Sequence, residues 1–249
     1  MPGPQEDSGS KPWLYGHTVP FGVWIAGLFL VAWFPEDLSP PLFAPIVYAV
    51  KSVLCAVLFI CWKPWRFYAK IEHRGLVRGF WAGLLVAAVW ILPEAPWMPE
   101  AFRDFYNRWL ILMPGQYPSY YPVLPEGHPS FQYSPEICGW GFTLAKLAGS
   151  AFVIAVLEEY FFRGFLYRWF QGGEAWRIPL VRFDTRAFWL TVLVFGFEHD
   201  RWFAGLFAGV VYGWLANRKG DLQGAVTAHV VTNFVLGAHV IVSRQYGFW

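Results

Sequence analysis

Charge is scarce in this sequence: only 14% of its 249 residues are charged, and the formal net charge is +2. So small a positive balance gives no electrostatic basis for binding nucleic acid, which we exclude as a partner. Cysteine is scarce too, and three residues without a C-x-x-C spacing provide neither a disulfide framework nor a thiolate metal site. Hydrophobic and aromatic residues, in contrast, make up 56% and 21% of the chain. This composition excludes an ordinary soluble domain and indicates an integral membrane protein.

Seven apolar runs predict the helices, and we expect residues 1–249 to form a single integral membrane domain of the all-α class. The predicted fold is a polytopic transmembrane helical bundle of about seven to eight helices. One run, 187–199, is shorter than the roughly 20 residues that cross a bilayer, so this helix starts earlier or stops part-way. An eighth helix would come from the aromatic stretch around Trp109–Met113. The seven runs are 21–34, 42–62, 76–92, 138–157, 187–199, 202–217 and 222–243.

The basic residues between these runs predict the orientation of the bundle. They gather after the second run and again after the fourth, and the positive-inside rule places both connections in the cytoplasm. The N-terminus is then cytoplasmic as well, and the expected location is the plasma (inner) membrane. The two groups are Lys63, Arg66, Lys70, Arg74 and Arg78, and Arg163, Arg168, Arg177, Arg182 and Arg186.

Two adjacent glutamates and an arginine end the fourth run, in the sequence LEEYFFRGF (157–165). If the helix continues to about residue 170, Glu159 and Arg163 are four residues apart and meet on one face. Glu158 lies about 100° further round the helix and is left without that partner. Taken alone, this stretch is more readily explained as a helix end whose charges reach the cytoplasmic interface.

Two further polar stretches interrupt the C-terminal runs. In FGFEHD (195–200), Phe195 and His199 share a helix face, although a single histidine at a helix end is usually structural. In AVTAHVVTNFVLGAH (225–239), His229 and Asn233 lie in a stripe of small residues that faces protein or a water-filled cavity. An interhelical hydrogen bond would explain that stripe equally well.

Together, the three stretches supply the components of a buried hydrolytic site: a carboxylate, two imidazoles and an amide. A carboxylate beside an imidazole can orient a water molecule and take its proton as a general base. An imidazole and a carboxamide can donate hydrogen bonds to the oxyanion of a tetrahedral intermediate. Hydrolysis of an amide in this way requires neither a covalent nucleophile nor a metal.

The ordered motifs E-E-x-x-x-R, F-x-x-x-H and H-x-x-x-N resemble those of the CPBP family, which groups C-a-a-X prenyl endopeptidases with bacterial Abi-type and bacteriocin-immunity proteins. The resemblance covers residues 138–240, the expected catalytic core. It implies an intramembrane endopeptidase without a cofactor, whose site lies inside the bundle and opens towards the cytoplasm. The partners that it implies are the lipid bilayer and a membrane-associated protein or peptide substrate, which is lipidated where it is a C-a-a-X protein.

The resemblance also implies roles for individual residues. Glu158 and His199 would activate the water, and His229 and Asn233 would stabilise the oxyanion. The supporting residues would be Glu159, Arg163 and Phe195. Glu198 departs from this scheme as a second carboxylate beside His199, and we expect it to point away, about 100° round the helix.

Three alternatives stay open on the sequence alone. Glu158, His199 and His229 could form a two-histidine, one-carboxylate zinc site, which would make the enzyme a metalloprotease. The chain could be a catalytically silent immunity or scaffold protein of the same fold, in which Glu158→Ala would leave the biological activity intact. It could also be a small transporter with a proton relay, although no inverted repeat is visible. Lys51 and Lys146 have no assigned role, despite a cost of about 2.5–3.5 kcal/mol for each lysine in mid-membrane.

Overall fold

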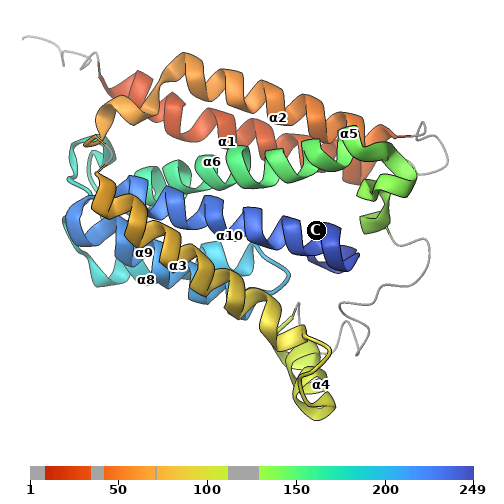
Figure 1. Ribbon diagram of the computed structural model, residues 1–249. Helices are drawn as coiled ribbons and strands as arrows, with labels where there is room; N and C mark the ends of the chain where they lie inside the picture. Colours follow the sequence, from red (N-terminus) through yellow and green to blue (C-terminus); the bar gives the residue numbers. More distant parts are fainter. Residues whose placement is uncertain (1–8, 35–41, 71, 112–128) are drawn as a thin grey trace, which may run out of the picture.

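Residues 9–34, 42–70, 72–111 and 129–249 are described in the computed structural model, and within them the chain is helical and contains no β-strand (Figure 1). The predicted all-α transmembrane bundle is confirmed. Five helical stretches are long and apolar enough to span a membrane: α1 (Ser10–Trp33), α2 (Phe43–Trp62), α3 with η3 (His73–Glu94), the continuous stretch from α5 to α7 (Pro135–Phe170), and α10 (Leu222–Ser243). The other α-helices are α4 (Glu100–Trp109), α8 (Thr185–Phe197) and α9 (Trp202–Lys219).

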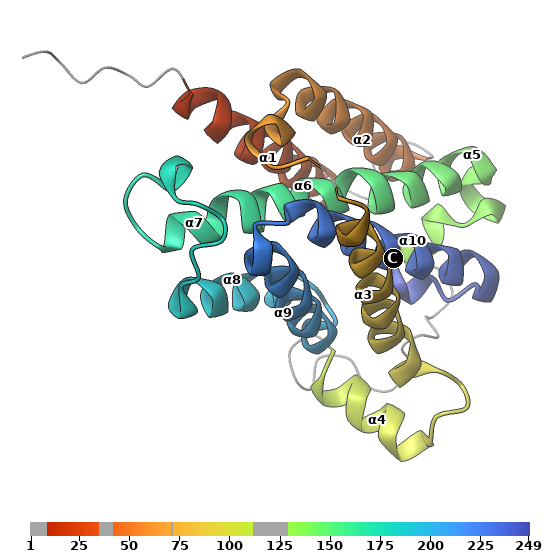
Figure 2. The ribbon, with the colours of Figure 1, turned by 60° about the vertical axis from the view of Figure 1, so that its left-hand side comes forward.

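Each of the seven apolar runs corresponds to a helix. The short fifth run is α8, whose 13 residues span about 20 Å and therefore less than the roughly 30 Å of a hydrocarbon core. Of the stretch predicted to form an eighth membrane element, the described part lies at the end of α4, whose 10 residues include several charges. Met113 lies outside the described residues. Helix α4 projects away from the bundle in two views (Figures 1 and 2).

Helices α3 and α10 pack with their backbones in close contact. A Cβ atom on Gly79 would lie 2.5 Å from the carbonyl oxygen of Gly224, and one on Gly83 would lie 2.5 Å from that of Ala228. No residue larger than glycine fits at these two positions, which are four residues apart on one face of α3. This small-residue packing is typical of membrane helices. It fixes the position of α10, which carries His229 and Asn233.

The stretch from α5 to α7 lies between the α1–α2 pair and α10 in both ribbon views (Figures 1 and 2). It changes helix type along its length. Two π-helical segments, η5 (Gly149–Ile154) and η6 (Tyr160–Leu166), enclose the single α-helical turn of α6 (Ala155–Glu159). Such π-helical segments occur frequently at functional sites. Here they flank the two adjacent glutamates.

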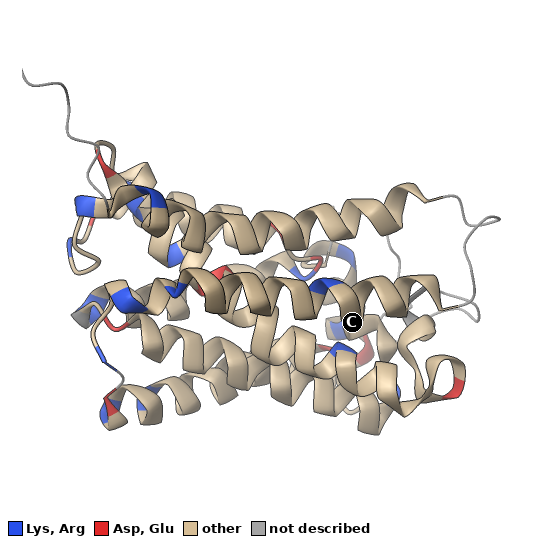
Figure 3. Cartoon of the chain, turned by 90° about the horizontal axis from the view of Figure 1, so that it is seen from above, with Lys and Arg blue, Asp and Glu red and all other residues tan. Residues whose placement is uncertain are grey.

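Lysine and arginine gather at one end of the bundle (Figure 3). The connections α2–α3, α7–α8 and α9–α10 all lie at this end, which we call the basic end (Figure 1). The positive-inside rule predicts that the basic end faces the cytoplasm.

Candidate active site

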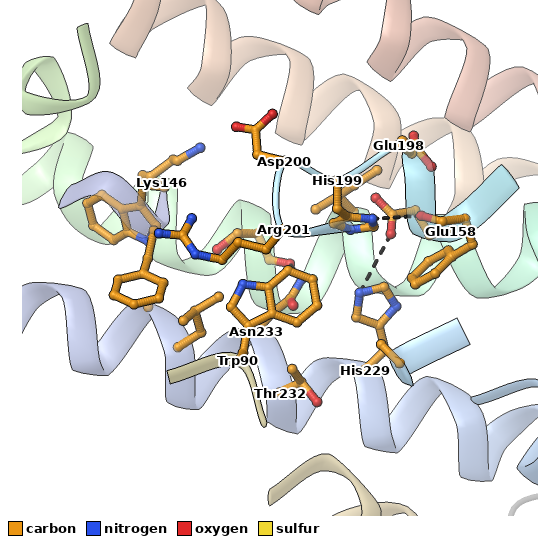
Figure 4. A pocket seen from close by; sticks show the side chains of 18 of the residues that line it. Trp90, Lys146, Glu158, Glu198, His199, Asp200, Arg201, His229, Thr232 and Asn233 are labelled. Atoms are coloured by element: carbon orange, nitrogen blue, oxygen red, sulfur yellow. Dashed lines mark hydrogen bonds and ion pairs between the residues drawn. The ribbon is translucent and has the colours of Figure 1, made fainter. Parts of the chain in front are cut away.

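A cavity of about 320 Å³ inside the bundle brings the predicted site residues together (Figure 4). Glu158, His199, His229 and Asn233 all line it. They come from α6, from the turn after α8 and from α10, which are far apart in the sequence. Three motifs, each of which is weak evidence for a site on its own, therefore contribute side chains to one cavity in the fold.

The pair predicted between Glu159 and Arg163 is confirmed. Glu159 is completely buried, and its Oε1 accepts hydrogen bonds from Arg163 Nη1 at 2.8 Å and from His229 Nδ1 at 2.9 Å. Arg163 also donates from Nη2 to the carbonyl of Gly209 at 3.3 Å, and its guanidinium carbon lies 4.2 Å from the ring centroid of Phe195. The guanidinium of Arg163 thus compensates the charge of Glu159 where both side chains are almost completely buried.

His229 lies between the two glutamates. Because Glu159 accepts the Nδ1 proton, the neutral imidazole presents an unprotonated Nε2, which lies 3.6 Å from Glu158 Oε2. The ring also stacks on Tyr212, with centroids 4.8 Å apart. The resemblance implies that His229 and Asn233 donate to an oxyanion. Among the described residues, the charged groups nearest to the His229 ring are the carboxylates of Glu158 and Glu159.

Glu158 differs from its neighbour in lining the cavity, which Glu159 does not. The residue is only 8% exposed, and its Oε2 has no hydrogen-bond partner among the described residues. A buried polar atom without a partner costs free energy, and a site that binds a polar ligand or water removes that cost. Glu158 is therefore the glutamate of the pair that faces the cavity, while Glu159 is paired with Arg163.

His199 and Asn233 each use one polar group to hold the side chain in place. His199 Nδ1 donates to the carbonyl of Phe195 at 2.8 Å, which leaves Nε2 unprotonated in the neutral ring. Asn233 Nδ2 donates one proton to the carbonyl of Ser150, in η5, at 2.9 Å. The second N–H of the same amide group is left to the cavity.

Glu198 also lines the cavity, which corrects the prediction that it points away (Figure 4). The prediction assumed a continuing helix, but α8 ends at Phe197. Glu198 and His199 belong to the turn that follows, so a rotation of 100° per residue does not apply to them. A second carboxylate therefore faces the same space as Glu158, and the two repel one another when both are charged.

A second buried ion pair, which the sequence did not suggest, closes one wall of the cavity. Arg201 donates to both carboxylate oxygens of Glu94, from Nε at 2.5 Å and from Nη2 at 3.0 Å. Its Nη1 donates to the carbonyl of Gly247 at 2.9 Å. The two charged residues are 107 positions apart in the chain, so no local pattern connects them.

The cavity extends towards the end of the bundle that lies away from the basic end (Figure 1). Its walls include the turn after α8 and the C-terminal residues Gly247, Phe248 and Trp249. These segments lie away from the basic end (Figure 1).

The zinc arrangement does not fit these side chains. In the part of the chain that the structure describes, no three His, Cys, Asp or Glu side chains are placed to hold a metal ion. Glu158, His199 and His229 line one cavity without forming such a group. We therefore assign no step to a metal.

The fold and the cavity define a class of protein: a helical integral membrane protein with carboxylates, imidazoles and an amide around an internal polar space. Residues 140–235 match a family model described as Type II CAAX prenyl endopeptidase Rce1-like. This segment contains all four predicted catalytic residues, and the match confirms the resemblance to the CPBP family, a family of membrane proteases. No curated protein and no solved structure matches the chain significantly.

Proposed function

We propose that the protein is an intramembrane endopeptidase that hydrolyses a peptide bond with a water molecule activated by Glu158. The observation that carries this proposal is that Glu158, whose Oε2 forms no hydrogen bond among the described residues, lines one cavity with two imidazoles and an amide. The match of residues 140–235 to CAAX prenyl endopeptidases supports the same reaction.

The proposed reaction begins with a water molecule between Glu158 and His199. One proton passes to Glu158, while the Nε2 of His199 accepts a hydrogen bond from the other and orients the oxygen towards the scissile carbonyl. His229 Nε2, which lies 3.6 Å from Glu158 Oε2, accepts a hydrogen bond from the protonated carboxyl group. This role follows from the ring's position between the glutamates.

Asn233 is the proposed donor to the oxyanion. Its second N–H lies in the cavity wall and points a partial positive charge at the oxygen on which negative charge develops. The carbon–nitrogen bond then breaks, and the proton held by Glu158 passes to the leaving nitrogen. The remaining hydroxyl proton of the tetrahedral intermediate also passes to the amine, so one water is consumed and a carboxylate and an ammonium group are formed.

The proposed substrate is a membrane-associated protein or peptide, lipidated if it is of the C-a-a-X type. A C-a-a-X substrate would be consistent with the family that the central segment matches. The plasma (inner) membrane and a cytoplasmic N-terminus are part of the same proposal, because the basic connections share one end of the bundle.

The test is product analysis with the purified full-length protein in lipid nanodiscs. Prenylated and unprenylated C-a-a-X peptides and randomised apolar peptides would be incubated with the protein, and new termini identified by mass spectrometry. We expect cleavage by the wild type, none by Glu158→Gln, and normal cleavage by Glu136→Gln, which changes an exposed carboxylate on α5.

Three outcomes would overturn the proposal. Cleavage that persists in Glu158→Gln would remove the assigned base. No cleavage of any peptide, together with partner binding that does not depend on Glu158, would favour the silent immunity or scaffold protein. Activity that a chelator abolishes and zinc restores would replace the proposed mechanism with the zinc-dependent one.

A further inference from the structure

Two lysines inside the bundle share one aromatic ring. Lys51 Nζ lies 4.2 Å from the ring centroid of Trp24 and 5.0 Å from that of Tyr48. Lys146 Nζ lies 4.3 Å from the same Tyr48 ring and 4.8 Å from Tyr133. The faces of these rings attract cations and offset part of the cost of burying them.

This arrangement leaves an excess of positive charge. Within the described residues, neither Lys51 nor Lys146 forms an ion pair with a carboxylate. The two ammonium groups also repel one another. Each lysine in mid-membrane costs about 2.5–3.5 kcal/mol, so an anion bound beside them would be strongly favoured.

Only Lys146 is in a position to contact such an anion. It lines the cavity together with the wall residues Trp24 and Tyr48, whereas Lys51 lies behind that wall and does not line the cavity. Figure 4 shows Lys146 at one end of the cavity and Glu158 at the other. The cavity thus has a cation at one end and the proposed base at the opposite end.

We propose that Lys146 binds the C-terminal carboxylate of the peptide substrate and so determines where the chain is cut. The proposal rests on the proposed peptidase function. Lys146 and Glu158 belong to one continuous helix and lie 12 positions apart, or about 18 Å along its axis. An extended peptide covers about 3.3–3.6 Å per residue, so a chain anchored at Lys146 would be cut about five residues before its C-terminus.

A binding experiment tests the proposal without requiring turnover. The full-length Glu158→Gln variant in nanodiscs would be mixed with fluorescently labelled apolar peptides, each made as a free acid and as a C-terminal amide. We expect the free acids to bind about tenfold to a hundredfold more tightly, because a hydrogen bond to a charged group is lost in the amide. Fluorescence anisotropy measures both affinities.

Three further variants in the same background assign the effect to a residue. Lys146→Met should bring the acid-to-amide ratio close to one, and Lys146→Arg should retain most of it. Lys51→Met is the matched control: it removes the neighbouring charge beside Tyr48 without removing a cavity contact, so it should lower the ratio much less. Lys146→Met removes a buried charge and keeps a long, unbranched side chain, so we expect this variant to fold.

The outcomes separate this proposal from the proposed function. Equal binding of acids and amides, or a preference that survives Lys146→Met, would overturn the role of Lys146 whether or not peptides are cleaved. The preference for free acids could also appear only after bound lipid is extracted from the protein and disappear when phosphatidic acid is added. That result would assign Lys146 to the binding of a lipid phosphate instead. If the wild type cleaves free-acid peptides at a constant distance from the C-terminus, and Lys146→Met at scattered positions, both proposals are supported.

Discussion

The molecule buries two networks of acids and bases that differ in how completely their atoms are paired. In the clasp, which we define as Glu94, Arg201 and the carbonyl of Gly247, both oxygens of the carboxylate accept hydrogen bonds from the guanidinium. In the site network of Glu158, Glu159, Arg163 and His229, one oxygen of each glutamate has no partner among the described residues. The clasp is saturated, which means that both carboxylate oxygens have hydrogen-bond donors; the site network is not.

This difference follows from what each network does. A saturated ion pair holds segments in place, and here it fixes the turn after α8 against η3 (Leu92–Glu94) and the C-terminus. An unsaturated carboxylate beside a cavity pays a desolvation cost that only a ligand or water can offset. Pairing, rather than the number of buried charges, therefore distinguishes the structural network from the proposed catalytic one.

The largest effect is expected from Glu158→Gln. The amide keeps the shape of the side chain but cannot take a proton, and loss of a general base lowers kcat by about 10²–10⁴-fold. Stability should be unchanged or slightly higher, because a buried charge without a partner is removed. Rates measured by peptide cleavage and unfolding measured by thermal denaturation in nanodiscs check both statements. A large loss of stability with normal kcat would show that Glu158 has a structural role like that of Glu94, and the two networks would then not differ in function.

Arg201→Met should have the opposite profile. It leaves the carboxylate of Glu94 buried and without its partner, which costs about 3–5 kcal/mol of stability. Replacing both residues, as in Glu94→Leu with Arg201→Met, should recover most of this loss, because two apolar residues need no pairing. Below the unfolding temperature, kcat should change little. If kcat of the double variant fell as far as that of Glu158→Gln, the clasp would have to take part in the reaction.

Asn233→Ala tests whether a buried amide that lines the cavity has a larger effect on the reaction than a buried amide that does not. Loss of one oxyanion donor lowers kcat by about 10²–10³-fold. Asn217→Ala is the matched control, because the amide of Asn217 also donates to a backbone carbonyl, that of Leu180 at 3.0 Å, but does not line the cavity. We expect Asn217→Ala to lower stability alone. Equal losses of kcat in both variants would show that Asn233 acts only through packing.

Much of this architecture could be predicted from the sequence, because hydrophobic runs and four-residue spacings are local signals. The seven runs identified the helices, and the helix phase correctly paired Glu159 with Arg163 and left Glu158 free of that pair. The prediction that Glu198 points away from the site was wrong, because the end of a helix cannot be located to one residue from an apolar pattern.

The rest depends on contacts between distant segments. The pairing of Glu94 with Arg201 joins positions that no periodicity relates. The position of His229 between two carboxylates depends on how α10 docks against α6, and that docking depends on the glycines of α3. Gly79 and Gly83 did carry a signal, a four-residue spacing of glycine within an apolar run, which is typical of helices that pack closely in membranes.

The smallest effect is expected from Tyr212→Phe, which tests where the site network ends. The hydroxyl of Tyr212 donates to Thr232 Oγ1 at 2.7 Å, while its ring stacks on the imidazole of His229. Phenylalanine keeps the stacking and loses only a neutral hydrogen bond, so stability should fall by about 0.5–1.5 kcal/mol and kcat only a few-fold. Thermal denaturation and peptide cleavage measure the two effects. A loss of kcat as large as that of Asn233→Ala would place the hydroxyl among the groups that move protons, and the unsaturated network would then extend through Tyr212 to Thr232.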